Sequence, residues 1–572
     1  MSAAAIVTGP PLSEADWIGP LTLPAFLKEV ARRHANRDAI IFYDPLDGRR
    51  RVCWSYAGLH EHARRFAKAL IAAGCGKGTR VGLLLGNRPE CVAGLFGAAY
   101  AGVTPVMLST FSSRDELSYL IHHAEISFLV TQSKLARRTF PEELIALCPE
   151  AATGDAEIRS ARFPYLRRIV VVGEQVGRGG IQPWQSFLDS GSGVTDELVD
   201  ARADGLVPSD HGLIFYTSGT TSAPKGVLHL QRGPTIQFWQ QARLYGRTPE
   251  TRIWSAFPIF WTAGLVAVMG STLAAGGCWV AQEMFDPGEA LWLMEHERVT
   301  EPYGFPVHTA ALAEHPDWLR TDLSSLRCLR GNYEFEHHPR AVNADPNWNM
   351  VKAYGLSETC AIVVGHPSTT PLEVQRESMG WPLHGNTVRI VDPETGRVLS
   401  IGQEGEICLK GPSMMESYVK QPREACFDED GFLHTGDSGY IDERQRLHWT
   451  GRLSDMIKTG GANVSPAEIE ARVAELGRLK VCRAVGVPDR RLGEMVVLCA
   501  VVKPGETVTE DEIRNFLRER LAAYKVPRRV VFFTDEELPL TPTGKLVVKE
   551  LRRLAAEKLG AQGGGGTAAQ GR

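Results

Sequence analysis

Residues 217–226 read TSGTTSAPKG and directly follow a short apolar run at 213–216. The run predicts a buried strand, and the glycines let the following backbone curl so that its N–H groups face an anion. Several hydroxyl side chains add donors, and a lysine adds a mobile positive charge suited to a polyphosphate. The loop therefore predicts a nucleotide site that contains Thr217, Ser218, Gly219, Thr220, Thr221 and Lys225.

The loop does not have the Walker A spacing, in which Gly-Lys directly precedes Ser or Thr. By composition alone it is also compatible with a plain surface turn. With Tyr216 in front, the full string resembles the nucleotide loop of the adenylate-forming superfamily, which holds acyl-CoA synthetases, non-ribosomal peptide adenylation domains and beetle luciferases. Ser222 departs from the glycine usual there but removes no donor. The resemblance implies an α/β fold: a large N-terminal domain of layered sheets and helices, and a small mobile α+β C-terminal domain.

A second segment, YGLSET at 354–359, resembles the Tyr-Gly-x-Thr-Glu motif of this superfamily. The resemblance implies that Tyr354 stacks on adenine and that Ser357 contacts the α-phosphate, with Gly355 in the same nucleotide site. It also implies that Glu358 helps to hold Mg²⁺, a hard cation that prefers carboxylate and phosphate oxygens. Without the resemblance, the tyrosine is typical of a core residue and the glutamate of a surface charge.

Three charged residues farther along complete the implied nucleotide site. Asp437, in an HTGD string, resembles the aspartate that binds the ribose hydroxyls in the family, and a carboxylate can accept two such hydrogen bonds. Arg452, in a GRLSD string, resembles an arginine that also reaches the ribose. Lys545 ends the string PLTPTGK and resembles the C-terminal lysine that drives adenylation. Each residue taken alone is typical of a turn or of a solvated surface charge.

The segment between these motifs carries the implied CoA and hinge residues. In CoA ligases of the family, the glycine that matches Gly461 lets the pantetheine arm pass close to the backbone, because glycine has no Cβ. Lys458 and Gly460 complete the expected CoA site. The small domain of the family rotates about a hinge that aligns with Ser454 and Asp455.

The expected acid pocket is apolar and larger than a pocket for acetate. Acetate-specific relatives carry tryptophan at the position that aligns with Gly355, and glycine removes that wall. Trp261 stands where many relatives have histidine, and we expect it to line or gate the pocket. The string GNYEFEHH, from residue 331, departs from the family pattern. The expected pocket residues are Trp261, Phe305, Gly331, Gly355 and Val363.

Composition excludes several other classes of protein. The 572 residues exceed one ordinary domain, and the formal net charge of −4 does not favour a nucleic acid or an anionic membrane as partner. Eleven scattered cysteines without a CxxC pair predict reduced thiols and a cytoplasmic protein. The uncharged stretch 256–281 is long enough to span a bilayer, but its proline and glycines predict a buried helix-and-turn segment and no membrane span.

Local patterns predict where elements and domains begin and end. Apolar residues at helical spacing predict a helix over 59–70, and apolar runs predict strands at 81–85, 169–172 and 496–502. A second amphipathic pattern predicts a helix over 513–524. The predicted domains are a disordered tail at 1–18, an adenylate-forming domain at 19–451, a hinge at 452–456, a mobile C-terminal domain at 457–556 and a disordered glycine-rich tail at 557–572.

The resemblance implies an ATP-dependent carboxylic acid:CoA ligase. The acid would attack the α-phosphorus of ATP with loss of pyrophosphate, and CoA would then take the acyl group from the adenylate with release of AMP. The implied catalytic residues are Lys545, Glu358 and Thr220, of which Thr220 and Glu358 hold the metal. ATP, Mg²⁺ and CoA are the expected cofactors. Medium-chain, branched, cyclic and aromatic acids stay open, as does a homodimer; the main alternative is an acyl-AMP ligase that loads a carrier protein.

Overall fold

The computed structural model describes residues 3–217, 224–459, 462–489, 492–521, 525–541 and 545–563. They form two compact units, each of which is described by itself. The large unit comprises Val7–Thr387 and Lys410–Leu433. The small unit comprises the N-terminal segment up to Ile6, Val388–Leu409 and His434–Arg572.

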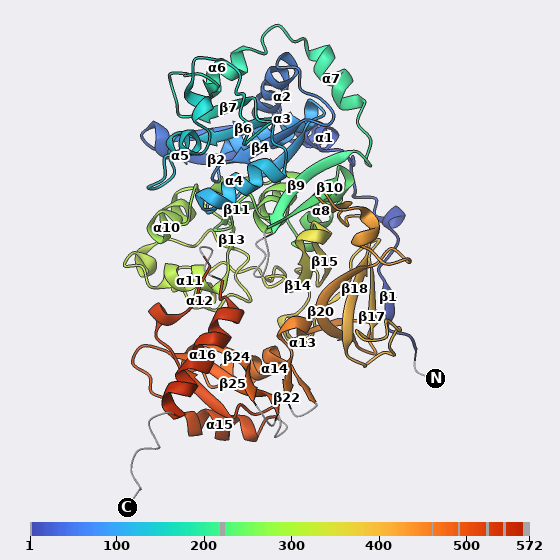
Figure 1. Ribbon diagram of the computed structural model, residues 1–572, viewed down its shortest axis with the longest axis vertical. Coiled ribbons are helices and arrows are strands. Elements are labelled where there is room, and N and C mark those ends of the chain that lie inside the picture. Colours follow the sequence, from blue (N-terminus) through green and yellow to red (C-terminus); the bar gives the residue numbers. More distant parts are fainter. Residues whose placement is uncertain are drawn as a thin grey trace, which may run out of the picture. The chain divides into compact units, whose positions relative to one another are not determined.

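An eight-stranded sheet forms the centre of the large unit (Figure 1). In spatial order its strands are β19 (Ser417–Tyr418), β10 (Lys225–Leu230), β9 (His211–Thr217), β5 (Thr104–Met107), β4 (Arg80–Leu84), β6 (Phe128–Gln132), β7 (Arg168–Val172) and β8 (Ile181–Pro183). The strands from β9 to β8 are parallel, and both faces are covered, since Val170 joins one core while Ile169 and Val171 join another. Continuous apolar runs are typical of such strands, and the strands predicted at 81–85 and 169–172 are confirmed within one residue.

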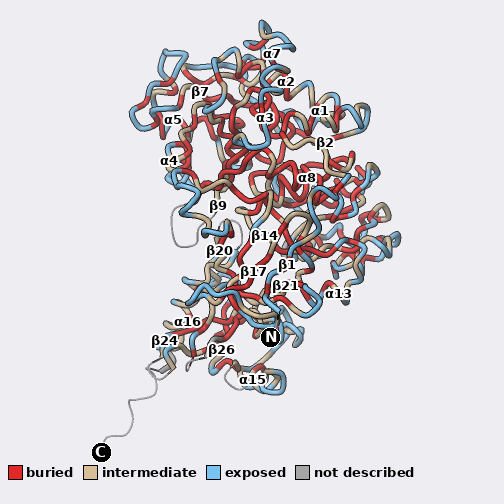
Figure 2. The backbone as a smooth tube through the Cα atoms, turned by 90° about the vertical axis from the view of Figure 1, so that its right-hand side faces the viewer, coloured by how far each residue is buried: buried red, intermediate tan, exposed pale blue. Residues whose placement is uncertain are grey.

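A second, mostly parallel sheet lies in the same unit. Its strands are β13 (Glu301–Tyr303), β11 (Arg252–Ser255), β12 (Cys278–Ala281), β2 (Asp38–Asp44) and the antiparallel β3 (Arg50–Ser55). One hydrophobic core takes side chains from both sheets and from several helices. These helices include α1 (Leu23–His34), α2 (Tyr56–Ala72), α3 (Pro89–Tyr100) and α8 (Arg232–Leu244), which are among the largely buried segments in Figure 2. The helix predicted over 59–70 lies within α2 and is confirmed.

The rest of the large unit covers these sheets. Its further helices are α4 (Arg114–His123), α5 (Phe140–Leu147), α6 (Trp184–Asp189), α7 (Asp196–Asp204), α9 (Ser271–Ala275), α10 (Pro287–His296), α11 (Pro306–Ala313), α12 (Tyr333–Glu336) and α13 (Leu372–Glu377). A third sheet consists of β14 (Ala353–Leu356), β15 (Ala361–Gly365) and β16 (Trp381–Pro382).

The uncharged stretch 256–281 is a buried part of this unit, as predicted. It contains a π-helix at Ala263–Gly270, then α9 and β12. None of the helices in the described part of the chain combines the length and the apolar character needed to cross a bilayer. All eleven cysteines are free thiols in the structure.

The small unit holds two further sheets. The first contains β1 (Ile6–Thr8), β17 (Thr387–Val391), β18 (Gly405–Lys410), β20 (Leu433–Ile441) and β21 (Leu447–Arg452). The second contains β23 (Ala462–Val464), β22 (Ile457–Thr459), β25 (Gly493–Val502), β24 (Leu479–Asp489) and β26 (Arg529–Phe532), with helices α14 (Pro466–Ala474), α15 (Glu510–Arg518) and α16 (Val548–Gly563). The mixed α/β architecture is as predicted, and β25 confirms the strand at 496–502.

Three predicted boundaries differ from the structure. The tail predicted at 1–18 contains β1, which pairs with β17, and Trp17 packs against the main core. Helix α16 continues past the predicted end of the domain at 556, because Leu559 packs on its core and Lys558 pairs with Glu537 at 2.8 Å. Helix α15 ends at Arg518 rather than at 524.

Candidate active site

The two ends of the predicted nucleotide loop meet in an antiparallel strand pair. Thr217 ends β9, Lys225 begins β10, and the two residues are partners in the register. Ser218, Gly219, Thr220 and Thr221 lie outside the described residues. The strand pair therefore fixes the two ends of the loop next to each other, with the lysine exposed at its exit.

A tyrosine connects this lysine to the predicted metal ligand. The Nζ atom of Lys225 lies 4.7 Å from the centre of the Tyr418 ring, a cation–π distance. The Tyr418 hydroxyl donates a hydrogen bond of 2.8 Å to the Glu358 carboxylate. Sequence reasoning missed Tyr418, because it reaches the site only through the pairing of β19 with β10, where it lies opposite Val227.

The turn that carries Glu358 is held by backbone hydrogen bonds from several directions. The N–H of Met415 donates to the Glu358 carbonyl at 2.7 Å, and the N–H of Leu356 donates to the Thr359 hydroxyl at 2.8 Å. Tyr354, on the preceding strand, is only 8% exposed. The acidic side chain is therefore presented from a fixed backbone, as a metal ligand requires.

A buried histidine, His229, forms a hydrogen bond with the backbone of the same turn. The Nε2 atom of His229 lies 2.8 Å from the Ser357 carbonyl, which accepts the hydrogen bond. Burial lowers the pKa of His229 to about 4, although this hydrogen bond acts in the opposite direction. The imidazole is therefore neutral near pH 7 and resists protonation in the folded protein.

We expect this histidine to make the large unit less stable as the pH is lowered below about 6.5. Its folded pKa is below the usual value near 6.5, so its contribution is complete above pH 6.5 and is lost as the pH falls towards 4. From pH 7 to pH 5 the loss is about 2 kcal/mol. Urea denaturation of the wild type and His229→Gln at both pH values isolates this residue, because all other histidines are common to the two proteins. An unchanged difference between them would contradict the expectation.

Backbone packing requires glycine at position 355. The sequence alone predicts instead that Gly355 enlarges the acid pocket. A Cβ at this position would lie 1.8 Å from the Ala361 carbonyl oxygen and 2.6 Å from its carbon. The close approach occurs where the β14–β15 register shifts. The irregular pairing of β14 with β15 therefore requires glycine at this position, whether or not the missing side chain also leaves space for an acid.

Gly355→Ala is expected to inactivate and destabilise the protein. The methyl group must push β15 away, and overpacking of this kind costs about 1–3 kcal/mol. Gly365→Ala, at the other end of the strand pair, is a matched control, because its Cβ would meet only side chains at 3.2 Å or more. Thermal unfolding and pyrophosphate release should both separate the two variants, and equal behaviour would count against the close approach.

The predicted acid-pocket residues lie on several elements of the large unit. Trp261 and Phe305 both follow carboxyl ends of strands in the second sheet, and Phe305 packs edge-on against Phe257 with ring centres 4.4 Å apart. Val363 is buried in β15 at 1% exposure. Gly331 has φ of +100° and faces Met350 and Leu372 rather than these aromatic rings.

The atypical segment after Gly331 folds into the short helix α12. The Asn332 side chain accepts a hydrogen bond from the N–H of Phe335 at 3.4 Å, and the Phe335 ring packs on Trp318. His338 bonds to the Trp318 carbonyl at 2.7 Å. Asn332, Phe335 and His338 of this segment therefore serve local packing and hydrogen bonding.

The predicted ribose-binding residues meet within the small unit. Asp437 and Arg452 are register partners on β20 and β21, and an Arg452 Nε to Asp437 Oδ1 distance of 2.8 Å joins them. The aspartate side chain is 3% exposed and the arginine side chain 48%. Glu406, which sequence reasoning missed, accepts from the Gly436 N–H at 3.0 Å and pairs with His434 at 2.8 Å. Its carboxylate thus shapes the turn before the aspartate from a neighbouring strand.

The remaining predicted residues also lie in the small unit. Lys545 is exposed, and its N–H donates to the Thr541 hydroxyl at 3.0 Å. Lys458 is exposed in β22. Gly460 and Gly461 lie outside the described residues, as does the side chain of Ser454. The Asp455 carboxylate lies 3.5 Å from Arg483 in β24, so the second hinge residue is tied to the body of this unit.

Comparison with known proteins identifies the family to which this chain is similar. The model of the AMP-binding enzyme family matches residues 27–419, and that of the AMP-binding enzyme C-terminal domain matches residues 468–545. A feruloyl-CoA synthase of Amycolatopsis sp is 33% identical over 87% of this chain and 93% of its own. A mitochondrial medium-chain acyl-CoA ligase, ACSF2 of Danio rerio, is 28% identical over 94% of this chain and 89% of its own.

Solved structures agree with this result. ATP-bound MatB from Rhodopseudomonas palustris is 26% identical, superposes with a TM-score of 0.75, and is matched over 94% of this chain and 99% of its own. The predicted resemblance to the adenylate-forming enzymes is thereby confirmed. The chain belongs to the AMP-binding enzyme family.

Proposed function

We propose that this chain is an AMP-forming ligase that joins a carboxylic acid larger than acetate to CoA. The observation that carries the proposal is the Lys225–Tyr418–Glu358 arrangement at the end of the nucleotide loop. It holds an ammonium and a carboxylate next to each other through one phenol, at 4.7 Å and 2.8 Å. In a family of AMP-binding enzymes, such a pair is suited to a polyphosphate and its cation.

Glu358, with the hydroxyl of Thr220, would hold Mg²⁺. The carboxylate is a hard oxygen donor that is fixed by its turn and by Tyr418, so its chemistry fits this ion. When bound, Mg²⁺ neutralises phosphate charge that builds up as pyrophosphate leaves. Lys225 and Lys545 would supply further positive charge, and one well-placed donor of this kind is worth about 10²–10³ in rate.

Asp437 and Arg452 would bind the ribose. The aspartate is nearly buried and is held by the arginine, so its orientation is set before any nucleotide arrives. A carboxylate so placed can accept hydrogen bonds from two vicinal hydroxyls. Lys458, Gly460 and Gly461 would take CoA, and Ser454 and Asp455 would serve as the hinge.

The acid is proposed to be aromatic or medium-chain. The aromatic side chains of Trp261 and of Phe305, which packs on the buried Phe257, offer apolar area at the carboxyl ends of the strands, where open α/β sheets bind ligands. Relatives named for feruloyl-CoA and for medium-chain acyl-CoA are consistent with either class. A cytoplasmic location is proposed on the reduced state of the cysteines.

A panel assay tests the proposal. Purified protein is mixed with ATP, Mg²⁺ and ferulic, octanoic or acetic acid, with and without CoA, and pyrophosphate, AMP and thioester mass are measured. We expect turnover with ferulic or octanoic acid and little with acetic acid, with AMP and thioester only when CoA is present. Pyrophosphate release without thioester formation on CoA would favour the acyl-AMP ligase that loads a carrier protein.

A further inference from the structure

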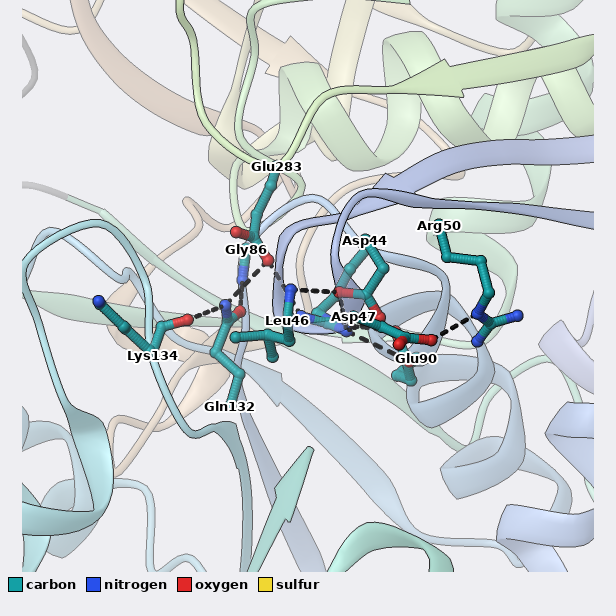
Figure 3. A network of polar contacts seen from close by, with 10 residues as sticks. Asp44, Leu46, Asp47, Arg50, Gly86, Glu90, Gln132, Lys134 and Glu283 are labelled. Carbon is teal, nitrogen blue, oxygen red and sulfur yellow. Dashed lines mark hydrogen bonds and ion pairs between the residues drawn. The ribbon is translucent and has the colours of Figure 1, made fainter. Parts of the chain in front are cut away.

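A buried turn joins the carboxyl ends of the two main sheets. Residues 85–88 connect β4 to α3, and Gln132 ends β6 in the same sheet. Asp44 ends β2 in the second sheet, and Glu283 follows β12. In Figure 3, dashed lines join Gln132 to Gly86 and to Glu283, and join Asp44 to Leu46.

Arg88 is the centre of this network. Its side chain is fully buried and pairs with Glu90 at 2.8 Å, Glu283 at 3.0 Å and Asp44 at 3.2 Å. Burial raises the pKa of Glu283, against the opposing effect of the arginine. Removing one partner of a buried charge pair is strongly destabilising, so these pairs fix the turn relative to both sheets.

Asn87 uses this fixed turn to hold the loop that follows β11. Its amide nitrogen donates to the Phe257 carbonyl at 3.0 Å, and its amide oxygen accepts from the Ile259 N–H at 2.7 Å. The side chain is 4% exposed. One side chain therefore satisfies a buried backbone donor and a buried backbone acceptor on either side of Pro258, because a carboxamide carries an N–H donor and an oxygen acceptor side by side.

The held loop leads directly to Trp261. The N–H of Trp261 donates to the Pro258 carbonyl at 3.1 Å, and the Trp261 carbonyl accepts from the N–H of Leu265 at 2.9 Å. Gly264 approaches Pro258 so closely that a Cβ would lie 2.1 Å from its carbonyl oxygen. The segment after the tryptophan is the π-helix, an element that is often found at functional sites.

We propose that Asn87 is a positioning residue that sets the place of Trp261 in the acid pocket. The inference rests on the proposed function, because it takes Trp261 as part of that pocket. Asn87 does not touch the acid; it acts through the backbone at Phe257 and Ile259. Loss of its two hydrogen bonds shifts the tryptophan, and a shift of about 1 Å at a binding group can cost up to 10²-fold in activity.

Hydrogen exchange tests the contact without any substrate. In Asn87→Ala we expect the amide of Ile259, followed in peptides that cover 256–262, to exchange at least about tenfold faster than in the wild type. Thr131→Val is the matched control, because Thr131 is buried at the same sheet edge and donates to the Leu84 carbonyl at 3.0 Å without touching this loop. Unchanged exchange at 256–262 in Asn87→Ala, or equal acceleration in the control, would overturn the proposal.

Kinetics with ferulic and octanoic acids test the consequence. Asn87→Ala should raise KM for the acid about tenfold and leave KM for ATP within about twofold, whereas Thr131→Val should change neither. Asn87→Asp has the same size but, as a carboxylate, cannot donate to the Phe257 carbonyl, so its KM for the acid should also lie above the wild-type value. If the wild type turns over an acid and Asn87→Ala has the same KM for that acid, the positioning role is refuted. If the wild type turns over none of the acids, the proposed function is refuted instead.

Discussion

Lys545→Ala is expected to abolish formation of the acyl-adenylate and to spare thioester formation from a supplied adenylate. The backbone of the lysine is held next to Thr541, since the two residues exchange hydrogen bonds of 2.7 Å and 3.0 Å. Its side chain is exposed. Positive charge is needed when the α-phosphorus is attacked, and removal of one such donor costs about 10²–10³ in rate. The second half-reaction has no departing pyrophosphate and lacks this need.

The measurement separates the two half-reactions. Pyrophosphate release from ATP and ferulic or octanoic acid reports the first, and thioester mass from synthetic acyl-adenylate and CoA reports the second. Lys549→Ala is the matched control, because this lysine is also exposed and lies four residues farther along the chain, in the first turn of α16. Equal loss of both half-reactions in Lys545→Ala would refute the assigned division of labour.

The fold was predictable where sequence patterns are local. Apolar runs and helical spacing located β4, β7, β25 and α2, because buried parallel strands and amphipathic helices leave direct patterns in the sequence. Chain ends were not predictable in this way. Only the pairing of β1 with β17, which is distant in sequence, shows that the N-terminal residues are ordered.

The site was predictable only where a short string carries the chemistry. The pairing of Asp437 with Arg452 places two separately predicted residues 2.8 Å apart. Tyr418, Asn87 and Glu406 were not predictable, because each acts through strand pairing or a loop contact over long sequence separations. No spacing rule links Asn87 to a carbonyl at residue 257.

For Gly355 the sequence predicted a role but not the structural reason for the glycine. Its place in a motif predicted a role in the pocket, yet the sequence could not show that the Ala361 carbonyl would come within 1.8 Å of a Cβ. A glycine can be explained by space for a ligand or by close backbone approach, and only coordinates distinguish the two.

Glu358→Gln is expected to lower the rate of adenylation by about 10²–10³ and to raise the Mg²⁺ concentration needed for half-maximal rate. The substitution keeps the size of the side chain, and the amide oxygen can still accept from the Tyr418 hydroxyl. What is lost is the negative charge that a divalent cation requires. Pyrophosphate release measured against Mg²⁺ concentration at saturating ATP gives both quantities.

Tyr418→Phe distinguishes the charge of Glu358 from its orientation. This variant removes the 2.8 Å hydrogen bond but leaves the carboxylate and the ring that faces Lys225. A single hydrogen bond to a charged group is worth about 1.5–3 kcal/mol, so the rate should fall by about 10- to 150-fold, less than in Glu358→Gln. The Mg²⁺ dependence should stay close to that of the wild type, because the negative charge remains. If Glu358→Gln keeps the wild-type Mg²⁺ dependence, the carboxylate acts through its contact with Tyr418 alone, and the cation must be held elsewhere in the nucleotide site.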